Sequence, residues 1–357
     1  MHIRSLKLAN YRNYEALELP LDERLTVLLG ENAQGKTNVL ESIYLCAAGR
    51  SHRTVHDGEL VRFGAEAAYV RVDLVRAGIS RRIEFRLPRA GRKQARLDGA
   101  PISRMGDLMG CLNAVLFSPG ELSLVKEGPG VRRRYLDILL CQTGGAYFYA
   151  LAAYQKALAQ RNALLKELAQ KGGDSAQLDV WEEQLERASG PLSAARKEAM
   201  DFIAPMAARM HGAISSGREE LAVSYRPDLS GPALRQALLD VRREDIRRGA
   251  TSHGPHRDDF LISINGAELR SFGSQGQQRT AALALKLAEL FCMEERVGEK
   301  PVLLLDDVLS ELDETRQGLL MEAVAPFQTI LTCTALPRRR NTGAVFQVKN
   351  GSLSPRF

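Results

Sequence analysis

The chain has 357 residues, of which 45% are hydrophobic and 26% are charged, and its formal net charge is +6. These fractions are those of a soluble globular protein with one large or two ordinary domains. No run approaches the roughly 18 apolar residues of a membrane span, and the first residues lack the apolar core of a signal peptide. The composition therefore excludes a membrane-spanning protein, and we expect a cytoplasmic one.

The net charge and the cysteine content say less about function than the hydrophobic content does. The positive charge comes mostly from arginine, which fits a polyanion such as nucleic acid, although an excess of this size is also found in proteins that bind none. Five cysteines lie far apart and form no CxxC pair: Cys46, Cys111, Cys141, Cys292 and Cys333. They are predicted to be buried free thiols, so neither a zinc site nor a disulfide framework is indicated.

The first predicted elements lead to a glycine-rich loop. Residues 2–8 alternate as in a strand, residues 10–14 form a polar and aromatic turn, and the apolar run 25–29 predicts a buried strand. Eight residues in the pattern GxxxxGK[ST] follow that strand: Gly30, Glu31, Asn32, Ala33, Gln34, Gly35, Lys36 and Thr37. Residues 38–45 then predict an amphipathic helix.

This pattern between a strand and a helix is typical of a phosphate-binding loop. The glycines let backbone N–H groups point at a phosphate, and the helix N-terminus adds the favourable end of its dipole. We expect Lys36 to reach the β- and γ-phosphates and the Thr37 hydroxyl to bind Mg²⁺. The alternative, a glycine turn without nucleotide, has little weight because strand and helix are both in place.

An antiparallel layer is predicted after the first helix. Its strands cover residues 69–75, 81–87 and 93–97, and an Asp98-Gly99 turn ends the third. Basic side chains are frequent in this part of the chain: Arg76, Arg81, Arg82, Arg86, Arg89, Arg92, Lys93 and Arg96. They either project charge into solvent or bind a polyanion, and the two interpretations have similar weight.

The middle of the chain predicts two heptad helices joined at residues 172–175 into an antiparallel hairpin. The predicted seams contain Tyr147, Leu151, Tyr154, Leu158, Arg161, Leu165 and Leu168, and then Leu178, Trp181, Leu185, Ala188, Leu192, Ala195, Ala199 and Phe202. The first helix would be about 35–40 Å long. We favour a short projecting arm over a helical subdomain packed on the head, although Pro191 and Pro205 should kink or interrupt the second helix.

The last third of the chain is predicted to alternate strands and helices. One of its buried strands is followed by two acidic residues. This alternation is typical of an α/β parallel sheet, which the strand at 25–29 must share. Asp306 and Asp307 follow the strand at 302–305. In P-loop ATPases the first such acid helps to hold Mg²⁺, and a neighbour orients or deprotonates water. We assign Asp306 to the metal, and Asp307 and Lys36 to catalysis.

The fold class is therefore α/β, a P-loop ATPase head with a mixed sheet and an antiparallel β layer, plus a short antiparallel coiled-coil arm. We expect residues 1–130 and 216–357 to form the two parts of the head and residues 131–215 to form the arm. Candidate phosphate contacts lie at the root of the arm and near the end: Arg132, Arg133, Arg134, Arg338, Arg339 and Arg340. Either cluster could equally be a solvated face.

A second glycine-rich stretch, residues 272–278, opens a long helix and offers another anion cradle. It resembles the signature of the ABC-type ATPase superfamily, in which a Ser-x-Gly-Gln motif closes over the nucleotide bound to the P-loop of another subunit. Residues 310–313 are similar to the D-loop of that superfamily. The resemblance implies that Ser274, Gly276 and Gln277 complete the nucleotide site of a second copy.

Four segments indicate one family within this superfamily. Residues 8–14, 30–38, 254–259 and 305–313 together look like the RecF family, SMC-like recombination mediators of bacteria, in the same order and over essentially the whole chain. The resemblance implies an ATP-dependent homodimer on duplex DNA near single-strand gaps. Such a protein acts with RecR and RecO to help load RecA, in repair, replication and the SOS response. Arg12 and Asn38 join the expected nucleotide-binding residues on the same ground.

Two departures from the wider superfamily predict a switch with slow, weak, DNA-dependent ATPase activity. Asp307 stands where most ABC-type ATPases have Glu, and its shorter side chain should position water less well. The usual switch histidine is absent, with Thr332, Cys333 and Thr334 in its place. Both departures suit a protein that dwells in its ATP state.

Two competing functions and one competing site have less support. The ATPase subunit of a membrane transporter shares the motifs, but the arm, the missing histidine and the basic surface do not favour it. A chromosome-tethering structural protein would need a longer arm. His253 and His256 could suggest a metal pair, but the arginine beside them disfavours a cation. We expect residues 254–259 to form a structural or interdomain loop.

Overall fold

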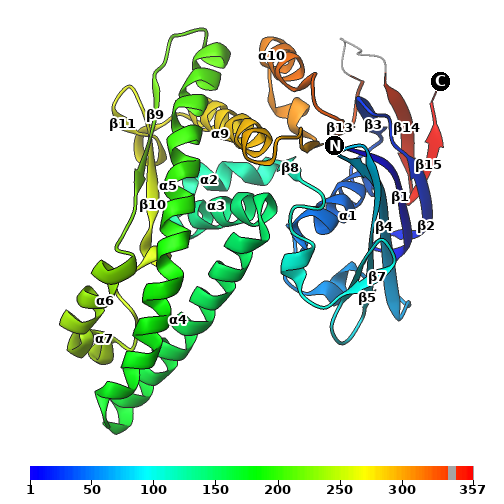
Figure 1. Cartoon of the computed structure of the whole chain (residues 1–357). Coiled ribbons are helices and arrows are strands. Elements are labelled where there is room, and N and C mark those ends of the chain that lie inside the picture. Colours follow the sequence, from blue (N-terminus) through cyan, green and yellow to red (C-terminus); the bar gives the residue numbers. More distant parts are fainter. Residues whose placement is uncertain (337–342, 357) are drawn as a thin grey trace. The chain divides into compact units, whose positions relative to one another are not determined.

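The computed structural model describes residues 1–336 and 343–356, and Figure 1 labels its helices and strands. The chain divides into two compact units. Unit 1 consists of Met1–Leu122, Ala213–Ser216 and Lys286–Phe357, and unit 2 consists of Ser123–Gly212 and Gly217–Leu285. This division differs from the predicted one for residues 217–285, which we expected in the head and which lie with the helical hairpin.

The core of unit 1 is a six-stranded mixed sheet in the order β15-β14-β3-β13-β12-β8. Its strands are β3 (Leu25–Leu29), β8 (Ala114–Phe117), β12 (Val302–Asp306), β13 (Thr329–Cys333), β14 (Ala344–Lys349) and β15 (Ser352–Pro355). All neighbours are parallel except β14 and β15. Every residue of β3, β12 and β13 is buried, as in strands covered on both faces. The predicted α/β sheet that joins distant parts of the chain is confirmed.

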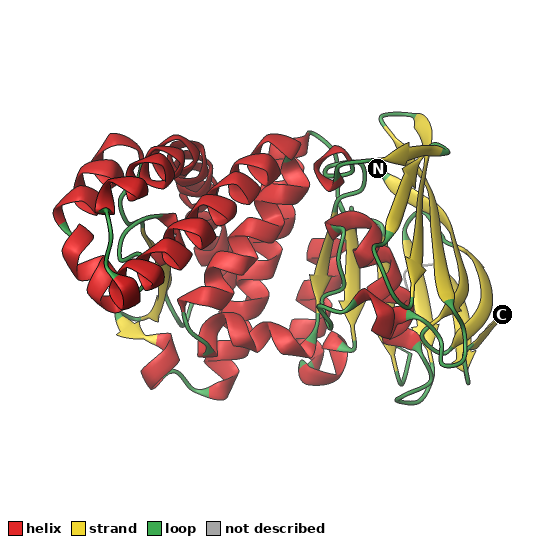
Figure 2. Cartoon of the chain, turned by 90° about the horizontal axis from the view of Figure 1, so that it is seen from below, coloured by secondary structure: helices red, strands yellow, loops and turns green. Residues whose placement is uncertain are grey.

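A second sheet of unit 1 is antiparallel, in the order β2-β1-β4-β5-β6-β7, which confirms the predicted β layer. Its strands are β1 (His2–Tyr11), β2 (Tyr14–Pro20), β4 (Ala67–Arg76), β5 (Ile79–Pro88), β6 (Gln94–Leu97) and β7 (Ala100–Ile102). Helix α1 (Lys36–Ala48) contacts strands of both sheets, and Figure 2 shows it between them. The glycine-rich loop at the start of α1 therefore emerges from the core of the unit.

Short helical elements complete unit 1: η1 (Asp57–Leu60), η2 (Met105–Asp107), η3 (Pro119–Leu122), η6 (Val308–Glu311) and α10 (Glu314–Val324). Among the described residues of both units, no helix combines the length and the apolar character that crossing a bilayer requires.

Unit 2 is built on α3 (Pro129–Thr143), α4 (Gly145–Lys171), η4 (Ser175–Leu178) and α5 (Asp179–Ser215). Two contacts give the direction of the hairpin. Arg161 of α4 pairs with Glu182 of α5 at 3.0 Å, and Arg196, further along α5, donates to the hydroxyl of Tyr147, near the start of α4, at 3.0 Å. The contacts occur in reverse order along the two helices, so α4 and α5 run antiparallel, as predicted.

The second helix of the hairpin continues through both prolines. Helix α5 is 37 residues long and contains Pro191 and Pro205. Of the two predicted outcomes, a kink or an interruption, the interruption is therefore wrong, and the kink stays a prediction. Each proline costs about 3 kcal/mol in a helix interior, but neighbouring side chains such as Leu192 and Ile203 are fully buried and hold the chain in register.

The predicted seam of α5 is correct at every second position. Leu185, Leu192 and Ala199 are fully buried, as predicted. Between them Glu182, Ser189 and Arg196 are buried, whereas the predicted Trp181, Ala188 and Ala195 are only partly so. Hydrophobicity failed at these positions because it assigned charged and polar residues to solvent. Here the charged residues are buried in pairs, as the Arg161–Glu182 contact shows.

The rest of unit 2 covers this hairpin. A small sheet contains β9 (Leu221–Arg226), β10 (Asp259–Ile264) and β11 (Ala267–Glu268), and the remaining helices are α2 (Ser123–Lys126), α6 (Gly231–Asp240), α7 (Arg242–Arg248), η5 (Pro255–Arg257), α8 (Leu269–Phe272) and the start of α9 (Gln275–Val297), whose residues from Lys286 on belong to unit 1. Helix α7 packs on α4, where Asp245 accepts from the fully buried Arg161 at 2.7 Å. The hairpin is therefore not a bare arm.

A buried carboxylate organises the loop at residues 254–259. Asp258, 1% exposed, accepts from Arg196 and from the Tyr225 hydroxyl, each at 2.7 Å, and from the backbone N–H of Asp228 at 2.8 Å. We call Asp258 with these three donors the Asp258 hub. It ties α5, β9 and the following loop to η5, which explains why residues 217–285 belong to unit 2.

Candidate nucleotide-binding site

The glycine-rich loop of unit 1 has the backbone that a phosphate requires. Gly35 has a φ of +111° and caps α1, and a Cβ on it would lie 2.4 Å from Nδ2 of Asn13. Only glycine fits this position without strain. The Lys36 side chain is 6% exposed, and its Nζ donates to the carbonyls of Gly30 at 2.5 Å and Glu31 at 2.8 Å. The lysine is thus held inside the loop, and the phosphate contact that the motif predicts stays a prediction.

Asp306, Thr37 and Thr332 meet at the carboxyl edge of the mixed sheet. Oδ1 of Asp306 accepts from the Thr37 hydroxyl at 2.9 Å and from the Thr332 hydroxyl at 2.8 Å. The Asp306 side chain is buried, with 8% of its surface exposed. Hydroxyl and carboxylate oxygens are hard ligands of the kind that Mg²⁺ prefers, usually beside phosphate oxygens and waters. The residues therefore fit the metal site that the sequence predicts.

Asp307 begins η6 in a left-handed conformation, with a φ of +52°. Its N–H donates to the Thr332 hydroxyl at 2.9 Å, so the same threonine orients both acids. Left-handed backbone favours Asp and Asn over Glu, which gives a structural reason for the shorter acid. Cys333, where the switch histidine is missing, is buried, and burial raises the pKa of its thiol to about 11.

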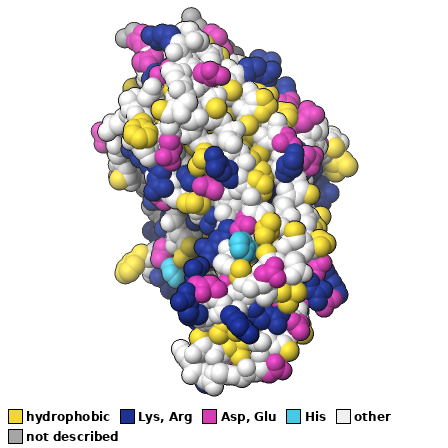
Figure 3. All heavy atoms as spheres, turned by 90° about the vertical axis from the view of Figure 1, so that its left-hand side faces the viewer, with side chains coloured by type: hydrophobic (Ala, Val, Ile, Leu, Met, Phe, Trp, Pro, Cys, Tyr) yellow, Lys and Arg dark blue, Asp and Glu magenta, His cyan; other side chains and the backbone are white. Residues whose placement is uncertain are grey.

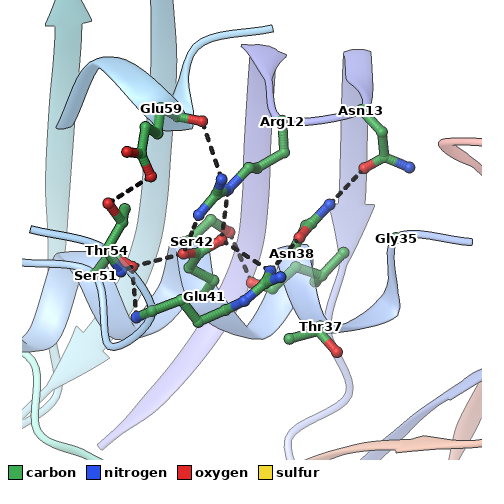
Figure 4. A network of polar contacts seen from close by, with 12 residues as sticks. Arg12, Asn13, Gly35, Thr37, Asn38, Glu41, Ser42, Ser51, Thr54 and Glu59 are labelled. Carbon is green, nitrogen blue, oxygen red and sulfur yellow. Dashed lines mark hydrogen bonds and ion pairs between the residues drawn. The ribbon is translucent and has the colours of Figure 1, made fainter. Parts of the chain in front are cut away.

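A buried glutamate on α1 holds two arginines beside the loop (Figure 4). Glu41, fully buried, accepts from Nε and Nη2 of Arg12 at 2.9 and 2.8 Å, and from the Ser51 hydroxyl at 2.6 Å. Arg53 lies 3.5 Å from the same carboxylate and donates to Asn38 at 2.8 Å. Burial acts against the charge, but Arg12 and Ser51 outweigh it and hold the pKa of Glu41 below its usual range.

Glu41, Ser51 and Arg53 were not predicted as site residues from the sequence. The available signal was a glutamate at an apolar position of the predicted helix, which indicates a buried partner of opposite charge. Arg12, which the resemblance assigned to the nucleotide, lines a pocket of about 1060 Å³ together with Asn13, Asn38 and Arg53. Val55 and Phe63 line the same pocket and are highly exposed.

The signature residues lie in unit 2. Ser274 and Gln277 exchange hydrogen bonds at the start of α9: the N–H of Ser274 donates to Oε1 of Gln277 at 2.8 Å, and the N–H of Gln277 donates to Oγ of Ser274 at 3.2 Å. This is a capping box. Ser274 and Gly276 are exposed. The 23-residue helix thus presents its N-terminus to solvent, a geometry that suits an anion supplied from outside the chain.

His256, for which a metal was disfavoured, and Arg132, a candidate phosphate contact, both make contacts within the chain. His256 contacts the Tyr154 hydroxyl with Nδ1 at 2.7 Å and the Thr251 carbonyl with Nε2 at 3.1 Å, so both ring nitrogens are occupied. Arg132 is buried in a bidentate pair with Asp259, with distances of 2.6 and 3.0 Å. It is not available to phosphate. The predicted contacts Arg338, Arg339 and Arg340 lie outside the described residues.

Comparison with known proteins gives the same class that the fold and site define. Residues 2–349 match the family described as RecF/RecN/SMC N terminal domain. The SMC head domain of Pyrococcus furiosus shares the fold, with a TM-score of 0.59 at 18% identity over 99% of this chain and 96% of that one. The chain therefore has the P-loop ATPase head of the SMC type.

Closer relatives identify the family within this class. The chain is 41% identical to the DNA replication and repair protein RecF of Clostridium tetani, over 98% of this chain and 99% of that protein. For Alkaliphilus oremlandii the identity is 42% over 99% and 100%. The solved recombination mediator protein RecF-ATP in the RecFOR pathway has a TM-score of 0.92 at 34% identity, over 100% of this chain and 98% of that chain. The chain belongs to the RecF family.

Proposed function

We propose that this protein is an ATP-dependent DNA-binding switch of replication and recombinational repair. The observation that supports this most directly is the meeting of Thr37 and Asp306 at 2.9 Å beside a buried P-loop lysine. The solved relative RecF-ATP, at 34% identity, supports ATP as the nucleotide. Loop residues 30–37 are the phosphate cradle in this proposal, and Mg²⁺ held by Thr37 and Asp306 would offset the phosphate charge.

The base and ribose bind in the pocket beside Arg12. This pocket adjoins the loop through Asn13 and Asn38, and it is open to solvent on the side of the exposed Phe63. Arg12 and Arg53 supply positive charge there, and Glu41 fixes their positions. The nucleotide therefore contacts residues from β1, α1 and the segment after α1.

Hydrolysis in this proposal is slow and serves to release the closed state. Lys36 stabilises the charge on the phosphates, and Asp307 orients the attacking water. Asp307 is short and its backbone is fixed by Thr332, so its carboxylate has little freedom to approach the water. A weak ATPase, acting as a timer, follows.

A second copy of the chain completes the site. Ser274 and Gly276 are exposed and Gln277 is partly buried at a helix N-terminus whose dipole suits the γ-phosphate bound by the partner. Phe272, just before this motif, is 77% exposed, which is unusual for an aromatic side chain outside an interface. ATP therefore joins two copies, and hydrolysis separates them.

The closed dimer holds duplex DNA near single-strand gaps and acts with RecR and RecO in loading RecA. The RecFOR pathway named for the solved relative supports these partners. Several arginines of the antiparallel sheet are already in ion pairs: Arg71 and Arg82 with Asp73, and Arg81 with Asp98. Figure 3 shows another face, the side of unit 2 that lies on the left in Figure 1, and there too Lys and Arg side chains are interspersed with acidic ones. DNA contact thus depends on a limited set of unpaired arginines.

The mass of the protein in solution tests this proposal. We expect Asp307→Asn, which slows hydrolysis, to be monomeric alone and dimeric with MgATP, and to bind duplex DNA in that state. Ser274→Arg should bind MgATP and remain monomeric, whereas Ser80→Arg, at an exposed serine of β5, should dimerise normally. An Asp307→Asn protein that stays monomeric with ATP and ignores DNA would contradict the proposal.

A salt titration separates the proposal from its alternative, the ATPase subunit of a membrane transporter. If several arginines contact phosphates, the affinity for duplex DNA should fall steeply as salt rises, by roughly 0.9 decades per contact for each decade of salt. A transporter subunit should bind no duplex at any of these salt concentrations.

A further inference from the structure

The turn between β14 and β15 touches the glycine-rich loop, although about 300 residues separate them in sequence. Strand β14 runs parallel to β3, the strand that enters the loop, so both strands end at the same edge of the sheet. Asn350 and Gly351 form the turn that follows β14, with φ values of +47° and +72°. The turn therefore lies beside the loop that follows β3.

The turn donates two backbone hydrogen bonds to Gln34 of the loop. The N–H of Asn350 donates to Oε1 of Gln34 at 2.7 Å, and the N–H of Gly351 donates to the Gln34 carbonyl at 3.3 Å. From the other side, Nδ2 of Asn13 donates to the same carbonyl at 3.0 Å. The hydroxyl of Tyr14 donates to the Gly35 carbonyl at 3.1 Å. Two turns thus hold two successive carbonyls of the loop.

These contacts fix the direction of the N–H groups that face a phosphate. In a trans peptide unit, the C=O of one residue and the N–H of the next point in opposite directions. When the carbonyl of Gln34 is held toward the two turns, the N–H of Gly35 points the opposite way, and holding the carbonyl of Gly35 does the same for the N–H of Lys36. These are N–H groups with which a P-loop binds phosphate.

Close packing makes this turn different from others of the same shape. Asp98-Gly99 and Asn265-Gly266 have the same pair of left-handed residues. A Cβ placed on Gly99 or Gly266 would meet nothing within 4 Å, whereas a Cβ on Gly351 would lie 2.5 Å from the carbonyl oxygen of Asn13. Gly351 is therefore needed for contact with the neighbouring turn as well as for backbone conformation.

We propose that the Asn350-Gly351 turn is a positioning element of the nucleotide site, which orients the Gly35 N–H group toward the phosphates through Gln34. This inference rests on the proposed function for the identity of the ligand. It adds the β14–β15 hairpin, which is distant in sequence, to the nucleotide site. The P-loop motif alone does not indicate this contribution.

Gly351→Ala tests the proposal, with Gly99→Ala as the matched control. Both changes place alanine at a left-handed turn position of unit 1, but only the first displaces the Asn13 turn. We expect Gly351→Ala to weaken MgATP binding about tenfold by calorimetric titration, which corresponds to about 1.4 kcal/mol. In hydrogen exchange without added nucleotide, the peptide containing residues 30–37 should exchange faster. Gly99→Ala should change neither quantity.

A second variant keeps the test decisive if Gly351→Ala folds poorly. Gln34→Met keeps the length of the side chain and removes the acceptor of the Asn350 N–H, and we expect the same two effects at smaller size. Wild-type affinity and unchanged exchange in both variants would overturn the proposal. If the wild type itself did not bind MgATP, the proposed function would fail, and the exchange experiment would still decide whether the turn positions the loop.

Discussion

Asp306 of unit 1 and Asp258 of unit 2 are both buried aspartates with several hydrogen bonds, yet their partners differ in charge. Asp258 accepts from the Arg196 guanidinium, a tyrosine hydroxyl and a backbone N–H. Asp306 accepts from two neutral threonine hydroxyls, and within the described residues it has no ion pair. The charge of Asp258 is thus neutralised inside the fold, whereas that of Asp306 is not.

This difference supports the proposed roles of the two acids, with Asp258 serving stability and Asp306 serving the proposed Mg²⁺ site. A buried charge is costly unless a counter-charge compensates it, so an acid that the protein leaves uncompensated has an external cation as its natural partner. Glu41 belongs with Asp258 on this criterion, because Arg12 and Arg53 already surround it. Burial alone would have placed all three in one category.

The largest expected effect follows from breaking the Asp258 hub. Asp258→Asn leaves Arg196 with one carboxylate partner, Asp137, and should lower the free energy of unfolding by about 3 kcal/mol. Calorimetry should show the melting temperature of unit 2 falling by roughly 10 °C. Asp201→Asn, which breaks an exposed pair with Lys197, should change stability by less than about 0.5 kcal/mol. Equal effects of the two variants would contradict the comparison.

Asp306→Asn should affect ATP hydrolysis and leave stability unharmed, the opposite of what we expect for Asp258→Asn. Because it removes an uncompensated buried charge, the melting temperature should stay the same or rise, while hydrolysis of ATP should fall about a hundredfold, roughly the loss of one stabilising group in a transition state. The affinity for ATP should also lose its dependence on magnesium, measured with and without a chelator. A large loss of stability would contradict the comparison, because it would show that Asp306, like Asp258, serves the stability of the fold.

Asp307→Glu tests whether the short acid limits turnover. A longer side chain should reach the water better and raise the single-turnover rate several-fold, but the left-handed backbone at this position should cost about 1 kcal/mol of stability. Both quantities are measurable on the same protein. A rate that is unchanged or lower would remove the explanation of slow turnover by side-chain length.

The smallest expected effect concerns the pH dependence of unit 2. Burial lowers the pKa of His256, whose ring contacts Tyr154 and the Thr251 carbonyl and faces the charges of Arg257, Arg133 and Asp228. A histidine with a lowered pKa stabilises the fold above its unfolded pKa of about 6.5, and this stabilisation is lost as pH falls below that value. His256→Gln should therefore flatten the decline of melting temperature between about pH 7 and 5. The exposed His56→Gln should leave the slope unchanged.

The nucleotide site could be predicted from sequence as far as its residues are local or follow a strand. The glycine-rich loop is a contiguous motif, and Asp306 ends an apolar run, so parallel strands alone bring them to one edge. The two heptad helices were predictable for the same reason, since periodicity is a local signal. The division into units was not, because residues 217–285 are joined to the hairpin by side chains such as Asp258 and Arg196.

The contacts that sequence could not reveal are those between charged residues in buried positions. Glu41, Glu182 and Arg196 are charged residues of the kind usually found at a protein surface. They are buried because each forms an ion pair with a residue that is not its neighbour in the sequence. Periodicity therefore predicted the apolar half of the α5 seam, such as Leu185 and Leu192, and missed the polar half by one residue. The Asn350-Gly351 turn is a similar case: its shape is encoded locally, but its contact with Gln34 depends on the pairing of β14 with β3.

The pairing of β3 with β13 and β14 has a consequence for synthesis of the protein. The loop strand leaves the ribosome early, but its two neighbours follow about 300 residues later, roughly 15–60 s at bacterial translation rates. All of unit 2 lies between them in the sequence and can fold first. The central sheet beside the glycine-rich loop is therefore completed only after unit 2 has been made, and its exposed apolar strands need protection from aggregation until then.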